Sequence, residues 1–360
     1  MTYRLGIVLT ACFLAAVLSA CGSAVSPPAF IAGSQIPAGK PLTAQSRKAA
    51  DGTFANLYVV NAGNNTVTVY APGRTQPLRT ISDGIANPFA LAFDSSGNLY
   101  VLNNAYFSNG NVTVYAPGST SVSETISQGI SYPFGLAIDR HDNLYVSNTN
   151  NSVAVYAPGT TSPKQQITDG ISDARGLAFD SLGNLFVADF GNSTVTVYRP
   201  GDRALIRTIS GGLTYPEWLT LDAADNLYVA SVGDYMYYIF SSVTVYARGG
   251  KRPIRRLDSI GDPRGFAFDA AGNLFVANCG SNCFYGYGNG DVTEYAPGSK
   301  SVLRTIDKEG PFPRSVAFSP SGNLFVANKK SITVYVSGKK KLLRTITQGV
   351  NFPFAIAFGP

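Results

Sequence analysis

A short apolar segment recurs seven times along the chain, each time as Asn, Leu, an aromatic residue and Val. Successive copies lie 41 to 50 residues apart. The copies begin at Asn56, Asn98, Asn143, Asn184, Asn226, Asn273 and Asn323. Because each segment is apolar on both faces, it predicts a strand that is covered on both sides. A regular period of this length predicts one repeated structural unit.

Each repeat predicts four short strands. In the copy over residues 167–208, the first strand is expected over residues 175–180 and the second, apolar on both faces, over 184–188. The third is expected over 194–198 and the fourth over 205–208, with Gly-containing turns between them. Four antiparallel strands per repeat predict an all-β fold, and with this period a β-propeller.

The two ends of the chain complement each other. The first repeat, residues 56–81, lacks a first strand, whereas residues 351–358 have the pattern of a first strand with no repeat after it. We therefore predict a seven-bladed β-propeller closed by a C-terminal strand that completes the first blade. Six blades would result if one irregular copy were not a full blade.

The N-terminus has the pattern of an export signal. Arg4 precedes an apolar run over residues 5–18. The run ends Leu-Ser-Ala-Cys-Gly at residues 18–22, which resembles a bacterial lipobox. The resemblance implies a lipoprotein signal peptide over residues 1–20 and a lipidated Cys21, and Gly22 resembles outer-membrane sorting if there are two membranes. An ordinary cleaved signal is the alternative.

Composition is consistent with an extracytoplasmic body on a tether. Residues 21–50 are rich in Ser, Ala, Pro and Gly and predict a flexible tether before a propeller over residues 51–360. Charged residues make up 14% of the chain and the net charge is +6, which is too mild and dispersed to indicate nucleic acid. Cys279 and Cys283 predict a disulfide, and two thiols alone do not make a metal site.

The strand motifs resemble a known repeat. The patterns Pro-x-Gly-Leu-Ala-Phe-Asp, Gly-Asn-Leu-Tyr-Val-Ala-Asn and Val-Thr-Val-Tyr resemble NHL repeats over residues 51–360. The wider group includes gluconolactonase-like and streptogramin-lyase-like propellers. Members of the first kind hold a divalent metal over the channel, and lyases of the second kind depend on His. The resemblance implies the fold strongly and an activity only weakly.

Candidate catalytic residues have simpler structural explanations. His141, the only His, falls in a predicted turn. A carboxylate at one shared repeat position predicts turn caps, at Asp94, Asp139, Asp180, Asp222 and Asp269. Polar residues that end the second strand predict backbone turns rather than a cation site, at Asn61, Asn103, Asn148, Asp189, Ser231, Asn278 and Asn328. We expect no catalytic set, no cofactor and no metal, with a metal-dependent hydrolase or lyase as the alternative.

Three loops between second and third strands are longer than the others and aromatic. They span residues 104–111, 232–242 and 279–291. We predict that they emerge on one face of the ring and bind a partner. Their candidate binding residues are Tyr106, Phe107, Tyr235, Tyr237, Tyr238, Phe284, Tyr285 and Tyr287.

A second candidate set should line the channel mouth on that face. The residues that follow the prolines of the blade connections, or their equivalents, are Phe354, Phe89, Phe134, Arg175, Glu217, Arg264 and Arg314, with Trp218 beside Glu217. One arc is apolar and the other charged. The sequence predicts a surface-tethered binding or scaffold protein for a glycan, peptide or envelope protein. The alternatives are that these side chains only pack between blades and that the protein is a structural envelope component.

Two polar features of the third and outer strands complete the predictions. One Arg recurs there, expected to be solvated and to protect the edge, at Arg79, Arg207, Arg255, Arg304 and Arg344. Glu294 replaces a third-strand Val and is expected to pair with a basic neighbour.

Overall fold

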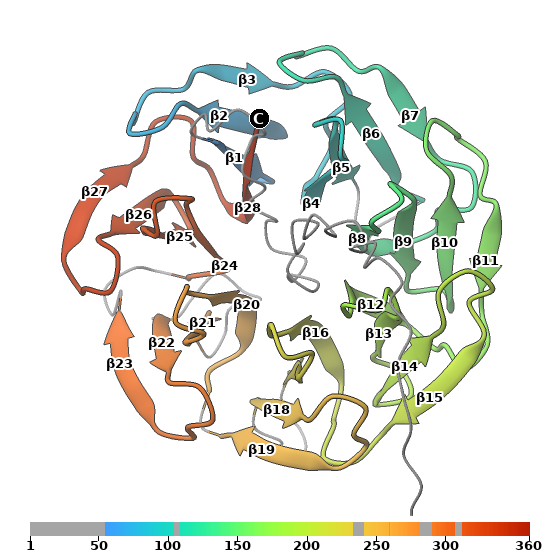
Figure 1. The fold of residues 1–360 in the computed structure, drawn as a ribbon. Helices are drawn as coiled ribbons and strands as arrows, with labels where there is room; N and C mark the ends of the chain where they lie inside the picture. The colour runs from blue at the N-terminus through green and yellow to red at the C-terminus, as the bar shows by residue number, and fades with distance from the viewer. Residues whose placement is uncertain (1–54, 104–108, 233–240, 259, 281–289, 307–311) are drawn as a thin grey trace, which may run out of the picture. The chain divides into compact units, whose positions relative to one another are not determined.

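The protein is a ring of seven four-stranded antiparallel sheets (Figure 1). The computed structural model describes residues 55–360 except 104–108, 233–240, 259, 281–289 and 307–311. Every regular element in these residues is a strand. We number the sheets as blades 1 to 7 along the chain, so blade 1 is β28-β1-β2-β3 and blade 7 is β24-β25-β26-β27. The predicted all-β, seven-bladed propeller is confirmed.

The strands occupy equivalent places in each blade. The inner strands of blades 1 to 7 are β28 Pro353–Gly359, β4 Pro88–Phe93, β8 Pro133–Ile138, β12 Ala174–Phe179, β16 Pro216–Leu221, β20 Pro263–Phe268 and β24 Ser315–Phe318. The second strands are β1 Asn56–Asn61, β5 Leu99–Asn103, β9 Leu144–Asn148, β13 Leu185–Asp189, β17 Leu227–Ser231, β21 Leu274–Asn278 and β25 Leu324–Asn328. The third strands are β2 Thr66–Tyr70, β6 Asn111–Tyr115, β10 Ser152–Tyr156, β14 Thr194–Tyr198, β18 Ser242–Tyr246, β22 Asp291–Tyr295 and β26 Ser331–Tyr335. The outer strands are β3 Arg79–Ile81, β7 Glu124–Ile126, β11 Gln165–Ile167, β15 Leu205–Ile209, β19 Pro253–Leu257, β23 Val302–Ile306 and β27 Leu342–Ile346.

The C-terminal strand closes the ring as predicted. β28 pairs antiparallel with β1, with Leu57 opposite Phe358 and Val60 opposite Ala355. The Tyr58 hydroxyl donates to the carbonyl of the last residue, Pro360, over 2.6 Å. The six-blade alternative is therefore wrong.

Aromatic residues of the repeat join neighbouring blades. The aromatic residue of a second strand meets the Phe that ends the inner strand of the next blade edge to face, with ring centroids 4.9 to 5.2 Å apart. Such pairs contribute about 0.5–1.5 kcal/mol beyond the area they bury. The pairs are Tyr58–Phe93, Tyr145–Phe179, Tyr228–Phe268, Phe275–Phe318 and Phe325–Phe358.

The Tyr that ends the third strand ties its blade to the preceding connection. The Tyr70 hydroxyl donates to the Gln348 carbonyl over 2.5 Å, and the Tyr198 hydroxyl donates to the Asp169 carbonyl over 2.5 Å. Tyr115 and Tyr156 make equivalent bonds. Burial raises the pKa of Tyr70 and of Tyr198 to about 12. The Tyr that ends the Val-Thr-Val-Tyr motif thus recurs as a hydrogen-bond donor to the preceding blade connection.

The repeated carboxylates cap turns, as predicted. Asp180 accepts from the backbone N–H of Leu182 over 3.0 Å and of Asn184 over 2.8 Å. Asp139 does the same in blade 3, where His141 is exposed. Glu294 is buried and pairs with Arg304 of the same blade, which confirms that prediction.

The prediction of solvated outer-strand Arg residues is wrong. Their guanidinium groups are half-buried, and four lie 5.6 to 5.7 Å above a second-strand ring of the same blade. Arg79 lies over Tyr58, Arg207 over Phe186, Arg255 over Tyr228 and Arg344 over Phe325. A long side chain can cover an aromatic face while its polar end reaches water, so packing governs this position.

Several predictions fall outside the described residues. These are the signal peptide and tether over residues 1–50 with Cys21, the predicted disulfide partner Cys283, and all eight candidate aromatic residues of the three long loops. Cys279 is described and fully buried, and it packs against Phe312. In the described part of the chain, no helix is long and apolar enough to cross a membrane.

Candidate functional site

A β-bulge near the start of the inner strand turns one side chain per blade into the central channel. In blade 2, Pro88 pairs with Asn103 and Ala90 with Leu102, which leaves Phe89 unpaired between them. The same irregularity occurs in blades 1, 3, 4, 5 and 6. Bulges re-aim side chains in this way. The channel residues are therefore Phe354, Phe89, Phe134, Arg175, Glu217 and Arg264, with Arg314 before β24 in blade 7.

The aromatic channel residues meet across the ring. Trp218 of blade 5 lies 5.9 Å from the Phe89 ring of blade 2 and 4.9 Å from the Phe134 ring of blade 3. Phe354 of blade 1 lies 4.9 Å from Phe89. Because blades 2 and 5 are not neighbours, these contacts can form only inside the channel. The rings form an apolar floor on one side of the mouth.

The charged channel residues form one ion-pair network on the other side. Glu217 is buried and pairs with Arg175 of blade 4 over 3.1 Å and with Arg264 of blade 6 over 3.2 Å. Arg175 also pairs with Asp173, and Arg264 with Asp262. Arg314 lies 4.4 Å above the Phe354 ring and joins the two arcs. The predicted apolar and charged arcs are both present.

The network is electrically balanced. Arg175, Arg264 and Arg314 face Asp173, Glu217 and Asp262, so three cations meet three carboxylates. Burial raises the pKa of Asp262 although Arg264 beside it opposes this change. An ion-pair network without net charge gives no strong preference for an anionic or a cationic ligand. Lys329 adds one cation at the rim, 5.2 Å from the Phe312 ring.

A second tier of residues surrounds this floor and was not predicted from the sequence. The residue two positions before each channel residue has a positive φ, between 45° and 65°, in all seven blades. Asn and Asp tolerate this conformation, but bulky residues rarely adopt it. These rim residues are Asn87, Tyr132, Asp173, Tyr215, Asp262, Phe312 and Phe352. Four of the seven are therefore aromatic residues held in a strained backbone conformation.

The rim also carries the start of the long loops. The carbonyl of Tyr215 accepts from Val232, the first residue of one long loop, over 3.2 Å. The carbonyl of Asp262 accepts from Cys279, the first residue of another, over 3.0 Å. Asn103, which pairs with Pro88, precedes the remaining loop. The described ends of all three loops thus lie at the mouth, on one face of the ring.

Among the residues of the mouth, Tyr132 of the rim and Trp218 of the floor have the side chains best suited to contact a ligand. In the described part of the protein, the buried indole N–H of Trp218 has no hydrogen-bond acceptor. Tyr132 is 45% exposed although it is a large aromatic residue. An aromatic face open to solvent is typical of a ligand site, whereas the Trp218 indole N–H lies below the surface.

The polar residues that end the second strands are used by the fold. Asn61 donates to Thr68 over 3.0 Å and to the Gly349 carbonyl over 3.1 Å, and accepts from the Asn351 N–H over 3.0 Å. Asn103 makes the equivalent bonds in blade 2. These side chains hold the connection between blades, as turn formation predicted. Among the described residues no group of three His, Cys, Asp or Glu side chains could hold a metal ion.

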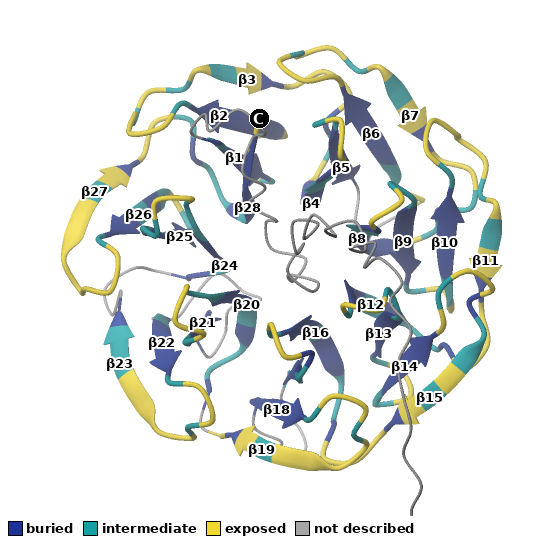
Figure 2. Ribbon diagram, in the orientation of Figure 1, coloured by how far each residue is buried: buried dark blue, intermediate teal, exposed yellow. Residues whose placement is uncertain are grey.

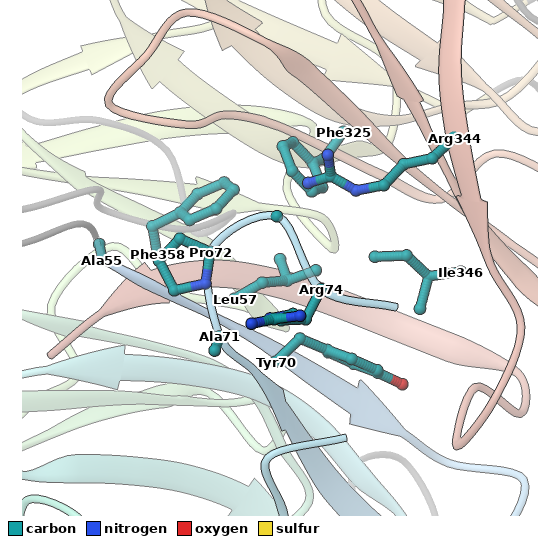
Figure 3. Close-up of a pocket in the computed structure, with 11 residues that line it drawn as sticks. Ala55, Leu57, Tyr70, Ala71, Pro72, Arg74, Phe325, Arg344, Ile346 and Phe358 are labelled. Atoms are coloured by element: carbon teal, nitrogen blue, oxygen red, sulfur yellow. The ribbon is translucent and has the colours of Figure 1, made fainter. Parts of the chain in front are cut away.

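A small cavity lies at the seam between blades 7 and 1 (Figure 3). Its volume is about 20 Å³, and its lining includes Tyr70, Arg74, Phe325 and Arg344. This volume suits a single water molecule rather than a small-molecule ligand. The seam is therefore a packing feature and the mouth is the better candidate site.

Two of the rim residues, Asp173 and Asp262, could have been found from the sequence. Arg175 and Arg264 each follow an Asp by two residues, a spacing that places opposite charges on one strand face. The aromatic rim residues gave no such signal, because a large residue before proline is not a usual choice for positive φ.

Comparison with known proteins supports the β-propeller fold but identifies no ligand. The NHL repeat family matches residues 172–198, which span β12, β13 and β14 of blade 4. No curated protein sequence matches the chain. A functionally unknown protein from Desulfotomaculum acetoxidans DSM 771 is similar in structure, with a TM-score of 0.66 and 14% identity over 84% of this chain and 98% of its own.

A second similar structure is the hydrazine synthase of Kuenenia stuttgartiensis. Its TM-score is 0.60 and its identity 16%, over 75% of this chain and 89% of its own. Identities this low show a shared fold only. The chain is a seven-bladed β-propeller in which blade 4 matches the NHL repeat.

Proposed function

We propose that this protein is a binding or scaffold protein whose ligand, a glycan or another uncharged molecule with flat faces, binds at the loop-bearing channel mouth. The observation that carries the proposal is the set of aromatic rim residues with positive φ, above all Tyr132 and Tyr215. Strained residues of this kind cost about 1–3 kcal/mol each and gather at functional sites. Asn87 occupies the same position in blade 2, so the fold itself does not require an aromatic residue there.

The chemistry of the floor supports the same conclusion. Sugars stack on aromatic faces, and the mouth offers the exposed Tyr132 ring and the half-buried Trp218 ring. The charges of the ion-pair network cancel, which fits a neutral glycan better than a phosphorylated ligand. A peptide or an envelope protein would use the same aromatic surface.

The lipobox-like sequence at residues 18–22 supports an extracytoplasmic location for this protein. In this proposal Cys21 carries the lipid, and residues 21–50 tether the propeller to the cell envelope. Two or more acyl chains on one N-terminus provide a stable anchor.

The test is a pair of rim variants on an array of oligosaccharides. Tyr132→Asn and Tyr215→Asn should lower the affinity for any glycan bound by the wild type at least about tenfold, because a stacking face is lost. The free energy of unfolding should stay the same or rise by up to about 1 kcal/mol, since Asn adopts positive φ more readily.

Controls separate the rim from the rest of the surface. Leu182→Asn removes an apolar residue that is 56% exposed in a turn at the opposite end of the strands, and should leave glycan affinity unchanged. Replacing Tyr237, Tyr238 and Tyr285 by Ser tests the long loops in the same assay. Unchanged affinity in both rim variants would overturn the proposed site. A hydrolase or lyase would instead show metal-dependent thermal stabilisation and turnover.

A further inference from the structure

The outer edge of blades 5, 6 and 7 carries an unusual concentration of positive charge. In every blade, eight residues separate the third-strand Tyr from the recurrent outer-strand position occupied by Arg in most blades. In blade 2 these residues, 116–123, include no charged side chain. In blades 5 to 7 they include seven cations and no acid, and all seven are exposed: Arg248, Lys251, Arg252, Lys300, Lys339, Lys340 and Lys341.

Large aliphatic side chains lie directly beside these cations. Ile254 is 58% exposed and Leu303 57%, and the equivalent Leu343 is 46% exposed. Val302 and Leu342 are exposed as well. At the position of Ile254, blades 1 and 4 also have an exposed aliphatic residue, Leu78 and Ile206, whereas blade 2 has Ser123 and blade 3 has Lys164. An aliphatic residue is therefore not required by the repeat, and blades 5 to 7 differ from blades 1 and 4 by the number of cations beside it.

The three outer strands follow one another around the ring, so the features form one surface. Figure 2 shows β19, β23 and β27 as consecutive strands with exposed stretches along one side of the outer circumference of the ring. We call this surface the cationic rim and define it by the seven cations and five aliphatic residues named above. It is distinct from the rim residues of the channel mouth. Asp258 pairs with Arg256 over 2.7 Å, and among the seven cations Arg248 lies 3.6 Å from the buried Asp225.

Protection of an exposed sheet edge does not explain the cationic rim. Lys on an edge strand prevents pairing with another chain. A protective edge would also carry polar residues at outward positions, as Ser123 does in blade 2. Blades 5 to 7 instead expose Ile254, Leu303 and Leu343 beside seven cations. Blades 1 and 4, which expose Leu78 and Ile206, have only three cations and one acid in the same stretches.

We propose that the cationic rim binds the surface of an anionic lipid bilayer. Lys and Arg are attracted to anionic headgroups, while aliphatic side chains enter the boundary between headgroups and acyl chains. A soluble polyanion would use the cations but would leave the five aliphatic side chains in water. The turns lie at the strand ends opposite the mouth, so membrane contact leaves the proposed ligand site free.

The experiment measures binding to lipid vesicles by sedimentation. All 28 strands and the ring closure lie within the compact unit Pro37–Pro360, so the chain from Pro37 onward is used and no N-terminal lipid contributes. The chain should bind vesicles of phosphatidylcholine with about one third phosphatidylglycerol and should not bind phosphatidylcholine alone. Salt at about 0.5 M should weaken binding, because it screens surface charges.

The variants use residues that the chain itself has at equivalent positions. Lys339→Ser, Lys340→Thr and Lys341→Ser together give blade 7 the turn of blade 2 and should weaken binding at least about tenfold. Ile254→Ser, Leu303→Ser and Leu343→Ser together should remove the binding that persists at high salt. Arg140→Ser, Lys164→Ser and Arg199→Ala together remove the same charge from blades 3 and 4 and should leave vesicle binding nearly unchanged.

Three results would overturn the proposal. One is equal binding of the blade 7 variant and the control variant, which would mean that only net charge matters. Another is binding to an anionic polysaccharide without binding to anionic vesicles. The third is a dimer in the ultracentrifuge that the aliphatic variant abolishes, with no vesicle binding, because the rim would then pair two copies of the chain.

Discussion

Blades 2 and 3 and blades 5 to 7 share one backbone and differ in side chains at both ends of their strands. At the mouth, blades 2 and 3 contribute Phe89 and Phe134, whereas blades 5 to 7 contribute Glu217, Arg264 and Arg314. At the outer rim, blade 2 has an uncharged turn and blades 5 to 7 have seven cations. The turns have the same length in both groups, so the backbone does not cause the difference.

The comparison separates positions at which the fold requires a particular residue from positions at which it accepts different residues. Turn carboxylates, third-strand Tyr hydroxyls and edge-to-face aromatic pairs recur around the ring and join strands or blades. The channel position and the outward positions of the outer strand vary between blades. Variation at positions of equal geometry shows that the fold does not set the residue there, so these positions are available for contacts with a partner. The following predictions test this division, from the largest expected effect to the smallest.

Glu217→Ala should change the free energy of unfolding more than any other variant in this comparison. The carboxylate is buried between Arg175 and Arg264, and its loss leaves two guanidinium groups facing each other. We expect a loss of about 3 kcal/mol in the free energy of unfolding, at the lower end for a buried ion pair because Asp173 and Asp262 still pair with the cations. Chemical denaturation measures the change.

An exposed ion pair of the outer strand provides the matched control. Arg256 and Asp258 are 2.7 Å apart, but their side chains are 42% and 67% exposed. Asp258→Ala should change the free energy of unfolding by less than about 0.5 kcal/mol. Equal effects of the two variants would mean that the mouth network is no more important to the fold than a surface pair.

Asp189→Asn should stabilise blade 4 by making it resemble blades 1 and 2. Asn61 and Asn103 donate to a third-strand Thr, whereas the carboxylate of Asp189 cannot donate to the buried hydroxyl of the equivalent Thr196. Asn at position 189 can supply this bond. We expect a gain of about 1 kcal/mol at neutral pH.

The gain should depend on pH with a definite sign. Burial raises the pKa of Asp189 above its ordinary value of 3.8, so folding favours the protonated form. The wild type therefore loses stability as the pH rises from that ordinary value through the raised one. The advantage of Asp189→Asn should be largest at neutral pH and smaller below pH 3.8. An advantage that grows on acidification would contradict this explanation.

Ile254→Ser should have the smallest effect on the fold. Its side chain is 58% exposed on β19, so the free energy of unfolding should change by less than about 0.5 kcal/mol. Thermal unfolding compared with the wild type measures this. A loss above about 2 kcal/mol would show that Ile254 packs within the fold, and the surface argument for the cationic rim would lose its main support.

Most of the fold could be predicted from the sequence because its causes are local and repeated. The Asn-Leu-Tyr-Val segment, the turn carboxylate and the unpaired strand at residues 351–358 fix the strands, the turns and the ring closure. The channel residues followed from the same register. The aromatic rim could not be predicted, because a positive φ at Tyr132 or Phe352 results from the bulge and the connection around it. The covering of aromatic rings by outer-strand Arg residues was also missed, since it depends on a contact across the third strand.

The most direct test of the account is hydrogen–deuterium exchange of the chain with and without the glycan selected on the array. The account predicts slower exchange in the bound state around Tyr132, Tyr215 and the starts of β8, β16 and β20, with no change along β19, β23 and β27. Slower exchange along those outer strands, with none at the mouth, would contradict it.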